Sequence, residues 1–303
     1  METVRRIVIG VDLPGGKVSE GSRLAIDQAR WMALRTGAHV TLLHSCHLDE
    51  HWDPASRTFE PSLETVAAEV NEALQDATEA LQNDGIEASY LITDSSAGLE
   101  ILRCVQQEHA DIVILGKRSQ SETDGRPLGS TSQNVVRNCP CPVLVVKPGS
   151  SPTPAVIVAA TDRSEVGRQV VDVAASIAER CDSVLHVVHA IQIDFEAQMS
   201  GDAARDALIR EQRAAFETEV AEQAAAAGFK GQVECHAGVT CPSRGVLEAE
   251  KQLQPDLIVM GTVARTGLPG VVLGNTAERL LGTLDTSLLV VKPAGFRSPL
   301  DLG

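Results

Sequence analysis

Aromatic residues are scarce in this chain of 303 residues, where five Phe, two Trp and one Tyr make up only 3% of the sequence. Hydrophobic residues nevertheless reach 43%, so the cores have to be built from Val, Ile, Leu and Ala. No apolar run approaches the roughly 18 residues of a membrane-spanning helix, and no apolar signal region follows the first residues. We therefore expect neither membrane insertion nor secretion.

Basic residues are also few, because 26 Lys and Arg face 41 Asp and Glu and give a formal net charge of −15. Such a charge repels nucleic acid and anionic membrane surfaces, so no nucleic-acid partner is expected. The seven cysteines are an odd number in a chain that is long enough to fold without disulfides. We interpret them as reduced thiols and predict a cytoplasmic protein.

Several catalytic signatures are missing as well. There is no G-x4-G-K-[ST] phosphate loop and no G-x-S-x-G nucleophile elbow. The turn Gly15-Gly16-Lys17 comes nearest to the phosphate loop, but Val11 stands where its first glycine should be. No nucleophile is accompanied by a base. We therefore expect no efficient enzyme and, at most, slow ATP hydrolysis that is incidental to binding.

What the sequence does contain is a long internal repeat. Asp111–Gly116 (DIVILG) returns 145 residues later as Asp256–Gly261 (DLIVMG), and Val145–Pro148 (VVKP) returns as Val290–Pro293. Each copy has a comfortable size for a single core. We therefore predict two domains, residues 1–149 and residues 150–303.

Within each half, buried strand-like runs alternate with amphipathic helices, which is typical of a doubly wound parallel α/β sheet. In the first half we expect strands near 7–11, 40–44, 87–93, 112–116 and 143–147, helices near 22–35, 62–83, 99–108 and 130–136, and an irregular connection over 47–61. In the second half we expect strands near 155–160, 184–189, 232–237, 257–261 and 288–292, and helices near 202–227 and 243–252. Five strands in the order 3-2-1-4-5 place strands one and four side by side, and ligands of such sheets bind outside the carboxyl ends at that switch point.

Two sequence features converge on this crevice. Asp12 and Asp162 follow the first strands, and Gly116 and Gly261 close the fourth strands. An Asp at this place can accept hydrogen bonds from a base or a ribose. The glycine lets the chain turn where a side chain would block a ligand. Their duplication at matched spacing favours a small-molecule pocket in at least one half.

Thirteen residues after each of these glycines, a helix is expected to begin, at Gly129-Ser130-Thr131 in one half and at Gly274-Asn275-Thr276 in the other. A helix start offers backbone N–H groups and the positive end of the helix dipole, both of which suit a phosphate. In the first half, Lys117 and Arg118 would balance the charge of the phosphate.

The sequence resembles the universal stress protein family, in tandem form and over nearly its whole length. That family's nucleotide-binding members carry G-x2-G-x9-G-[ST] after strand four and an Asp after strand one. Here the pattern reads G-x2-S-x9-G-S from Gly116 and G-x2-A-x9-G-N from Gly261, so Ser119 and Ala264 replace the second glycine. The string Gly261–Gly267 (GTVARTG) resembles the E-type tandem members, which act in stress adaptation and do not consistently bind ATP. The resemblance implies an adenine nucleotide alpha hydrolase-like fold.

Together, these features select fourteen candidate ligand-binding residues. They are Asp12, Gly116, Lys117, Arg118, Gly129, Ser130 and Thr131 in the first half, and Asp162, Gly261, Thr262, Arg265, Gly274, Asn275 and Thr276 in the second half.

The last strand of each half bears on assembly. Val143–Val146 and Leu288–Val291 are apolar on both faces and lie at a sheet edge, which is an aggregation liability if it is bare. Universal stress proteins pair this strand across a two-fold axis, so the resemblance implies that the two copies pair within one chain as an internal pseudo-dimer. The alternative is that each edge is covered by its own loop, with residues after Pro293 adding cover. Further dimerisation is left open.

Three functional hypotheses remain. The first is a cytoplasmic stress-response module that binds ATP or a related adenine nucleotide, with the pocket best preserved in the first half, where Asp12 would hold the base or ribose and Gly129–Thr131 the phosphate. The second is a pocket for an apolar or mixed ligand, because Leu268–Leu273 is apolar where a triphosphate would need cations. The third is a weak ATPase.

Histidines and cysteines gather at two places that we do not predict to bind a metal. Neither group has a paired C-x2-C spacing, and neighbouring strand residues point to opposite faces. The groups are His44, Cys46, His47 and His51, and Cys235, His236 and Cys241. For Cys139-Pro140-Cys141, we predict a helix-to-strand turn and not a redox motif.

Overall fold

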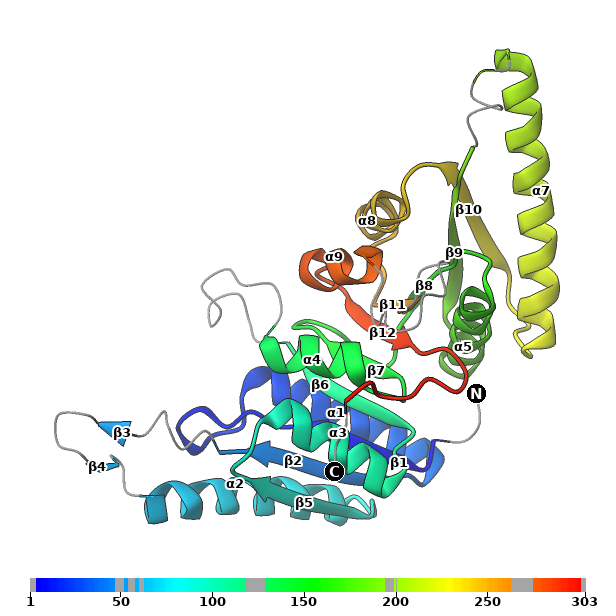
Figure 1. Ribbon diagram of the computed structural model, residues 1–303. Coiled ribbons are helices and arrows are strands. Elements are labelled where there is room, and N and C mark those ends of the chain that lie inside the picture. The colour runs from blue at the N-terminus through cyan, green and yellow to red at the C-terminus, as the bar shows by residue number, and fades with distance from the viewer. Residues whose placement is uncertain are drawn as a thin grey trace. The chain divides into compact units, whose positions relative to one another are not determined.

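The structure is a computed structural model that describes residues 4–46, 52–53, 58–59, 63–117, 129–193, 199, 201–262 and 275–300. The chain divides into two compact units (Figure 1). The first contains Glu2–Pro152 together with the segment from Phe296 onward, and the second contains Thr153–Gly295. Among the described helices, none is both long and apolar enough to cross a membrane.

The first unit contains five parallel strands in the order β7-β6-β1-β2-β5. Numbered along the chain, this is the order 3-2-1-4-5 read from the other end, and it confirms the predicted topology. The strands are β1 (Arg6–Gly10), β2 (His39–Ser45), β5 (Ala88–Thr93), β6 (Ile112–Gly116) and β7 (Val143–Val146).

The helices of the first unit also lie where the apolar periodicity predicts them. They are α1 (Glu20–Thr36), α2 (Leu63–Asn83), α3 (Ala97–Glu108) and α4 (Ser130–Asn138). The structure adds a short 3-10 helix, η1 (Pro14–Gly16), which the sequence did not predict. The connection predicted to be irregular contains an additional two-stranded antiparallel ribbon, in which β3 (Trp52–Asp53) pairs with β4 (Thr58–Phe59). The aromatic and β-branched residues of these two short strands favour an extended backbone.

The second unit repeats the same topology, with its sheet in the order β10-β9-β8-β11-β12. Its strands are β8 (Val156–Ala160), β9 (Val184–Ile191), β10 (Val233–Val239), β11 (Leu257–Gly261) and β12 (Ser287–Val291). Its helices include α5 (Glu165–Cys181), α7 (Asp202–Ala226), α8 (Pro242–Leu253) and α9 (Asn275–Thr283). The packing of α7 against β10 and α5 is visible in Figure 1.

The first helix of each unit begins and ends at equivalent residues. The hydroxyl oxygen of Ser19 accepts a hydrogen bond from the backbone N–H of Ser22 (3.2 Å), and that of Ser164 accepts one from Gly167 (3.1 Å). Serine is among the preferred N-cap residues because it satisfies such a free N–H group. The predicted end of α1 is also confirmed, since Gly37 adopts the left-handed conformation with φ 70°.

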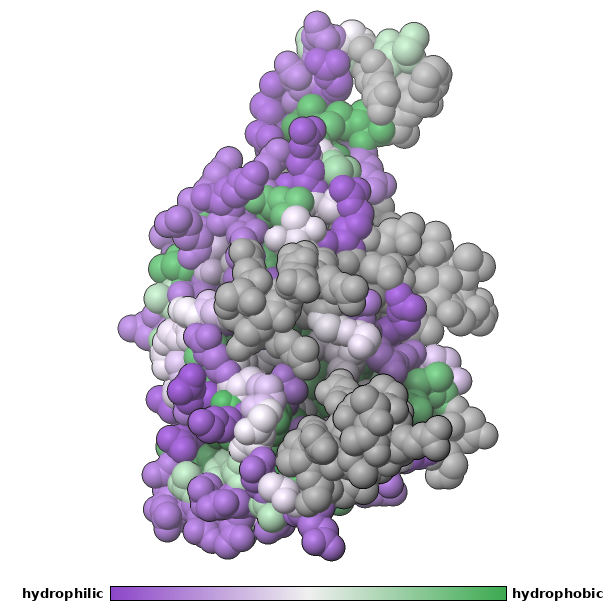
Figure 2. All heavy atoms as spheres, turned by 90° about the vertical axis from the view of Figure 1, so that its left-hand side faces the viewer, coloured by the Kyte–Doolittle hydropathy of each residue, from purple (hydrophilic) through white to green (hydrophobic). Residues whose placement is uncertain are grey.

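Aliphatic side chains fill both cores, as the scarcity of aromatic residues requires. The central strands β1 and β6 of the first unit and β8 and β11 of the second are buried along nearly their whole length. Phe216 on α7 is the largest fully buried side chain among the described residues. The described surface in Figure 2 is mostly hydrophilic, with hydrophobic residues in small separate patches, in keeping with the net charge of −15.

Candidate functional site

The carboxyl ends of β1 and β6 form the switch point of the first unit. The two strands are neighbours, with Gly10 in register with Leu115. Asp12 follows β1 and Lys117 follows β6, so the fold brings both residues to the same edge of the sheet. Lys117 is buried, and its backbone N–H donates to the carbonyl oxygen of Val146 (2.8 Å).

The first turn of α1 holds the backbone of Asp12 in place. The N–H of Asp12 donates to the Ser22 hydroxyl oxygen (2.7 Å), and the N–H of Ser19 donates to the Asp12 carbonyl oxygen (3.0 Å). The two serine hydroxyls are themselves hydrogen-bonded (2.9 Å). We did not select Ser19 or Ser22 from the sequence, although their spacing before an apolar run is a recognisable helix-start signal.

A buried histidine supports the same loop in both units. Nδ1 of His44 lies 2.8 Å from the carbonyl oxygen of Val11, and Nδ1 of His189 lies 3.0 Å from that of Thr161. A carbonyl oxygen only accepts hydrogen bonds, so Nδ1 is the protonated nitrogen in each ring. Each histidine thus joins the end of the second strand to the residue before the site aspartate.

Gly116 is required by packing. A Cβ atom at this position would lie 2.0 Å from the carbonyl oxygen of Gly21 in the first turn of α1. The two glycines therefore allow α1 to approach the end of β6 closely. The close contact with α1 therefore explains why position 116 needs a glycine, whether or not a ligand binds nearby.

The start of α4 is open, in contrast to that of α1. Gly129 has φ −65° and ψ 152°, and no side chain of the described residues caps the helix there. A Cβ atom on Gly129 would meet nothing within 4 Å. Ser130 is exposed, and no acidic residue lies in the first turn of α4. Within the described part of the chain, no side chain therefore covers the positive end of this helix.

The equivalent edge of the second unit is arranged differently. Oδ1 of Asp162 accepts hydrogen bonds from the backbone N–H (3.0 Å) and the hydroxyl (2.5 Å) of Ser164 at the start of α5. A Cβ atom on Gly261 would lie 2.6 Å from a methyl group of Val166. Thr262 is buried, and its N–H donates to the carbonyl oxygen of Val291 (3.2 Å).

Some of the candidate residues lie outside the described part of the chain. These are Arg118, Arg265 and Gly274, together with the pattern positions Ser119 and Ala264 and the apolar segment Leu268–Leu273. Asn275 and Thr276 lie in the first turn of α9, and only their backbone is described.

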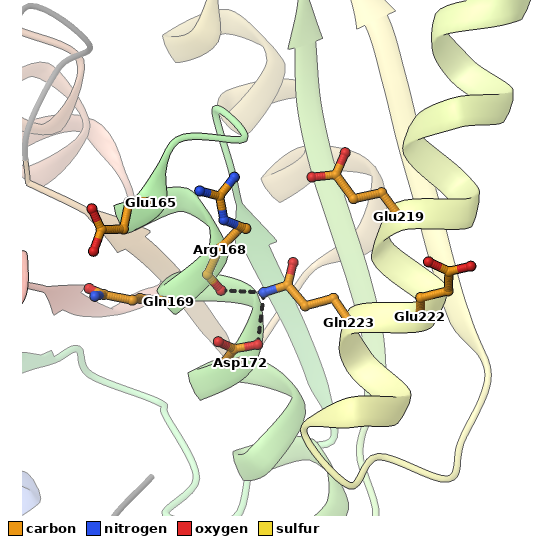
Figure 3. Close-up of a pocket in the computed structure, with 7 residues that line it drawn as sticks. All are labelled: Glu165, Arg168, Gln169, Asp172, Glu219, Glu222 and Gln223. Carbon is orange, nitrogen blue, oxygen red and sulfur yellow. Dashed lines mark hydrogen bonds between the residues drawn. The ribbon is translucent and has the colours of Figure 1, made fainter.

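A groove of about 530 Å³ lies between α5 and α7 of the second unit (Figure 3). Four carboxylates and one arginine line it, so it is unsuited to a phosphate-bearing ligand. Gln223 from α7 spans the groove and donates to the Arg168 carbonyl oxygen (2.6 Å) and to Asp172 Oδ1 (2.7 Å). Through these two hydrogen bonds, Gln223 connects α7 to α5 across the groove. Its lining residues are Glu165, Arg168, Gln169, Asp172, Glu219, Glu222 and Gln223.

All seven cysteines are free thiols, and their environments differ widely. Burial, helped by Glu108 and Glu100, raises the pKa of Cys104 to about 12. Cys139 and Cys141 lie with their sulfur atoms 3.4 Å apart in the buried turn between α4 and β7, and this contact raises the pKa of Cys141. By contrast, the hydrogen bond from the backbone N–H of Arg244 lowers the pKa of the exposed Cys241.

Comparison with known proteins identifies the family. Residues 3–147 and residues 155–292 each match the model of the universal stress protein family. The chain belongs to the universal stress protein family. It is a tandem member, since each of its two units carries one copy of the family domain.

Individual relatives agree with this assignment. The chain is similar to the universal stress protein E homolog of Haemophilus influenzae, with 26% identity over 221 residues that cover 68% of this chain and 70% of that protein. A universal stress protein of Methanocaldococcus jannaschii is 31% identical over 140 residues, which cover 45% of this chain and 81% of that one. A solved structure of a functionally unknown protein from Pseudomonas aeruginosa PAO1 aligns with TM-score 0.69 and 26% identity, covering 96% of this chain and 93% of the other.

Proposed function

We propose that the first unit of this universal stress protein binds ATP or a related adenine nucleotide and acts as a regulatory module in the stress response. The observation that carries the proposal is that Asp12 follows β1 while α4, which no described side chain caps, begins after the neighbouring strand β6. Because α4 follows β6 and runs back toward β7, its N-terminus lies at the same edge as the loop that carries Asp12.

Each residue of this edge has a role in the proposal. The Ser22 hydroxyl holds the backbone N–H of Asp12. The carboxylate of Asp12 accepts hydrogen bonds from the base or ribose. The backbone N–H groups and hydroxyls of Gly129–Thr131 bind phosphate, for which a helix N-terminus is suited. Lys117 and Arg118 balance the charge of the phosphate.

A thermal-shift titration of the full-length protein with ATP, ADP, AMP and cAMP tests this proposal. We expect at least one nucleotide to raise the melting temperature, and Gly129→Val to abolish that rise, because the added side chain would occupy the space of the phosphate. Gly201→Val is the matched control. Gly201 has nearly the same backbone angles at the start of α7, and a Cβ atom there also meets nothing within 4 Å. An unchanged nucleotide shift in Gly129→Val would refute the placement.

For the second unit, we propose a degenerate pocket that takes a non-nucleotide, apolar or mixed ligand. The motivating observation is that the carboxylate of Asp162 is already engaged at the start of α5. Native mass spectrometry of protein purified without additives tests this. A bound species other than a nucleotide, retained in the Gly129→Val variant, would support it. A nucleotide that stays bound in that variant would contradict it.

Catalysis is the weaker alternative for the first unit. The described residues of the edge include no nucleophile with an adjacent base, so ATP turnover in the proposal is slow and incidental. Hydrolysis that continues unchanged in Gly129→Val and Ser130→Ala would identify a contaminating enzyme as its source.

We further propose that β7 and β12 pair within one chain and that the protein works in the cytoplasm. Each strand ends its own unit's sheet and is apolar on both faces, so an uncovered edge would invite aggregation. The seven free thiols suit a reducing compartment. Monomeric full-length protein, together with separately expressed halves that associate in solution, would support the pairing. Halves that stay apart at high concentration would contradict it.

A further inference from the structure

Three side chains that we did not group together from the sequence meet on one face of the second unit's sheet. His186 on β9 is in register with Glu234 on β10, and paired residues of parallel strands point to the same face. His236 follows Glu234 by two positions, so it shares that face as well. Nδ1 of His186 lies 3.1 Å from Nε2 of His236 and 3.3 Å from Oε2 of Glu234.

These separations fit the coordination of a single metal ion. Two ligands of a tetrahedral site with bonds of about 2.0–2.1 Å lie roughly 3.3 Å apart. The three possible ligand atoms of the cluster all lie within 4.8 Å of one another. The Glu234 side chain is 53% exposed and can rotate to shorten its distance to His236.

Two members of the cluster, His186 and Glu234, differ in their exposure to solvent. The His186 side chain is only 9% exposed, and its burial lowers the pKa of the imidazole, an effect that His236 reinforces and Glu234 opposes. The exposed Glu234 leaves one side of the cluster open to solvent.

Two cysteines close in sequence to the cluster, Cys235 and Cys241, are not part of it. Cys235 points to the opposite face of β10, as strand alternation requires, and burial raises its pKa to about 11. Its thiol is therefore not among the ligand atoms that converge in the cluster. Cys241, at the start of α8, is likewise not among the residues that converge there.

We propose that His186, Glu234 and His236 form a binding site for one divalent transition-metal ion of the zinc class. Two imidazole nitrogens and one carboxylate oxygen are the ligand types that Zn²⁺ accepts while it keeps an open position for water. The ion would tie the edge strand β10 to β9. The site is independent of the proposed nucleotide edge, because it lies in the other unit.

The first unit supplies an internal comparison. At the positions 145 residues earlier, the same pair of strands carries Thr41, Ser89 and Leu91. Thr41 donates a hydrogen bond to Glu108 (2.8 Å). The cluster is therefore a feature of the second unit's sequence and is not imposed by the shared fold.

Isothermal titration of chelator-treated full-length protein with ZnCl₂ tests the proposal. We expect one saturable site per chain, weakened at least about 100-fold in His236→Gln, since the loss of a ligand exceeds the 10–100-fold cost of losing an outer-shell partner. At 100 times the Kd, zinc should raise the melting temperature of the wild-type protein by about 5 °C or more. Glu234→Gln leaves both imidazoles and should weaken binding less than His236→Gln does.

His39→Gln is the matched control, because His39 lies at the start of β2 in the first unit and should leave zinc affinity unchanged. Cobalt gives a second readout that does not depend on stability: the wild-type protein should develop visible d–d bands without a thiolate charge-transfer band. Equal zinc affinity in wild type and His236→Gln, or thiolate absorption in the cobalt complex, would overturn the proposal, as would the absence of saturable binding in the wild type.

Discussion

The two units share one fold but differ at matched positions near their ligand edges. Ser22 in α1 binds the backbone of Asp12, whereas the equivalent residue of the second unit is Gly167, which packs against Asp162. The carboxylate of Asp162 turns inward to Ser164 at the start of α5. The comparison shows that the two units keep the same fold, whereas the residues around the aspartate at the ligand edge differ.

The features that both units share are those that hold the start of the first helix and the loop before the aspartate. Both units keep the Ser cap of the first helix, and both keep the histidine that binds the loop before the aspartate. Ser19 and both histidines are buried, Ser164 is partly buried, and all four side chains are hydrogen-bonded, so that replacing them leaves a polar partner unsatisfied. The following predictions test where the equivalence of the two units holds and where it fails.

Gly116→Ala should have the largest effect on stability. Its Cβ atom would collide with the backbone of Gly21, and backbone cannot move aside as a side chain can, so we expect a loss of roughly 3 kcal/mol. Gly261→Ala meets only a methyl group of Val166 and should cost about 1 kcal/mol. Calorimetry of the full chain, following each thermal transition, measures both losses. A loss of only about 1 kcal/mol for Gly116→Ala would show that the close approach of α1 to β6 is not critical.

His44→Leu and His189→Leu should destabilise the protein by similar amounts. Each change leaves a buried carbonyl oxygen, of Val11 or of Thr161, without its imidazole donor, and we expect a loss of about 2 kcal/mol in each case. Urea unfolding measures the loss. His39→Leu, at the less buried start of β2, is the control and should cost less than about 1 kcal/mol. A large difference between the two main variants would mean that the histidines have separate roles.

Asp162→Ala should cost about 1 kcal/mol, because it removes the acceptor of two hydrogen bonds at the start of α5. Asp162→Asn keeps one acceptor oxygen and should cost less. The same unfolding experiment compares the two variants. If Asp162→Ala is as stable as the wild-type protein, the carboxylate does not support the helix start.

Cys241→Ser should change stability by less than about 0.5 kcal/mol, the smallest effect of the series, yet it should remove the most reactive thiol. Cys241 begins α8 where Ser96 begins α3, and a helix start favours the thiolate. Because the pKa of Cys241 is lowered, its alkylation rate should reach half of its maximum at a lower pH than that of an ordinary thiol. Cys104, with a pKa of about 12, should react much later than Cys241.

Mass spectrometry after timed iodoacetamide treatment gives the order of labelling. The variant Ser96→Cys extends the comparison to the first unit, where a thiol at the equivalent helix start should also label early. Labelling of Cys104 or Cys235 before Cys241 would contradict the assignment.

Much of the fold was predictable because its signals are local. The apolar runs, the helix periodicity and Gly37 predicted the order of the strands and most element boundaries to within a few residues. The short ribbon of β3 and β4 was missed because two-residue strands have no periodicity. Of the candidate site, the sequence predicted that Asp12 and Gly129 share one edge, because Asp12 follows β1 and Gly129 precedes the helix that comes after β6.

Other parts of the site could not be predicted, because they depend on side chains from separate elements. His186 and His236 lie 50 residues apart, and only the register of β9 with β10 brings their rings together. Alternation along a single strand correctly separated Cys235 from His236, but it gave no information about the neighbouring strand. Ser22 likewise reaches Asp12 only through the packing of α1 on the sheet.

By itself, the sequence determined that this protein consists of two copies of a parallel α/β sheet with an aspartate and a helix start at each switch point. Periodicity and strand-end residues suffice for this, because they act over a few positions of the chain. Only the tertiary structure decided that the carboxylate of Asp162 accepts hydrogen bonds from Ser164, the N-cap residue of α5, and that two histidines and a glutamate converge on one face. Such details depend on strand register and helix packing, which are set by the closure of the whole core.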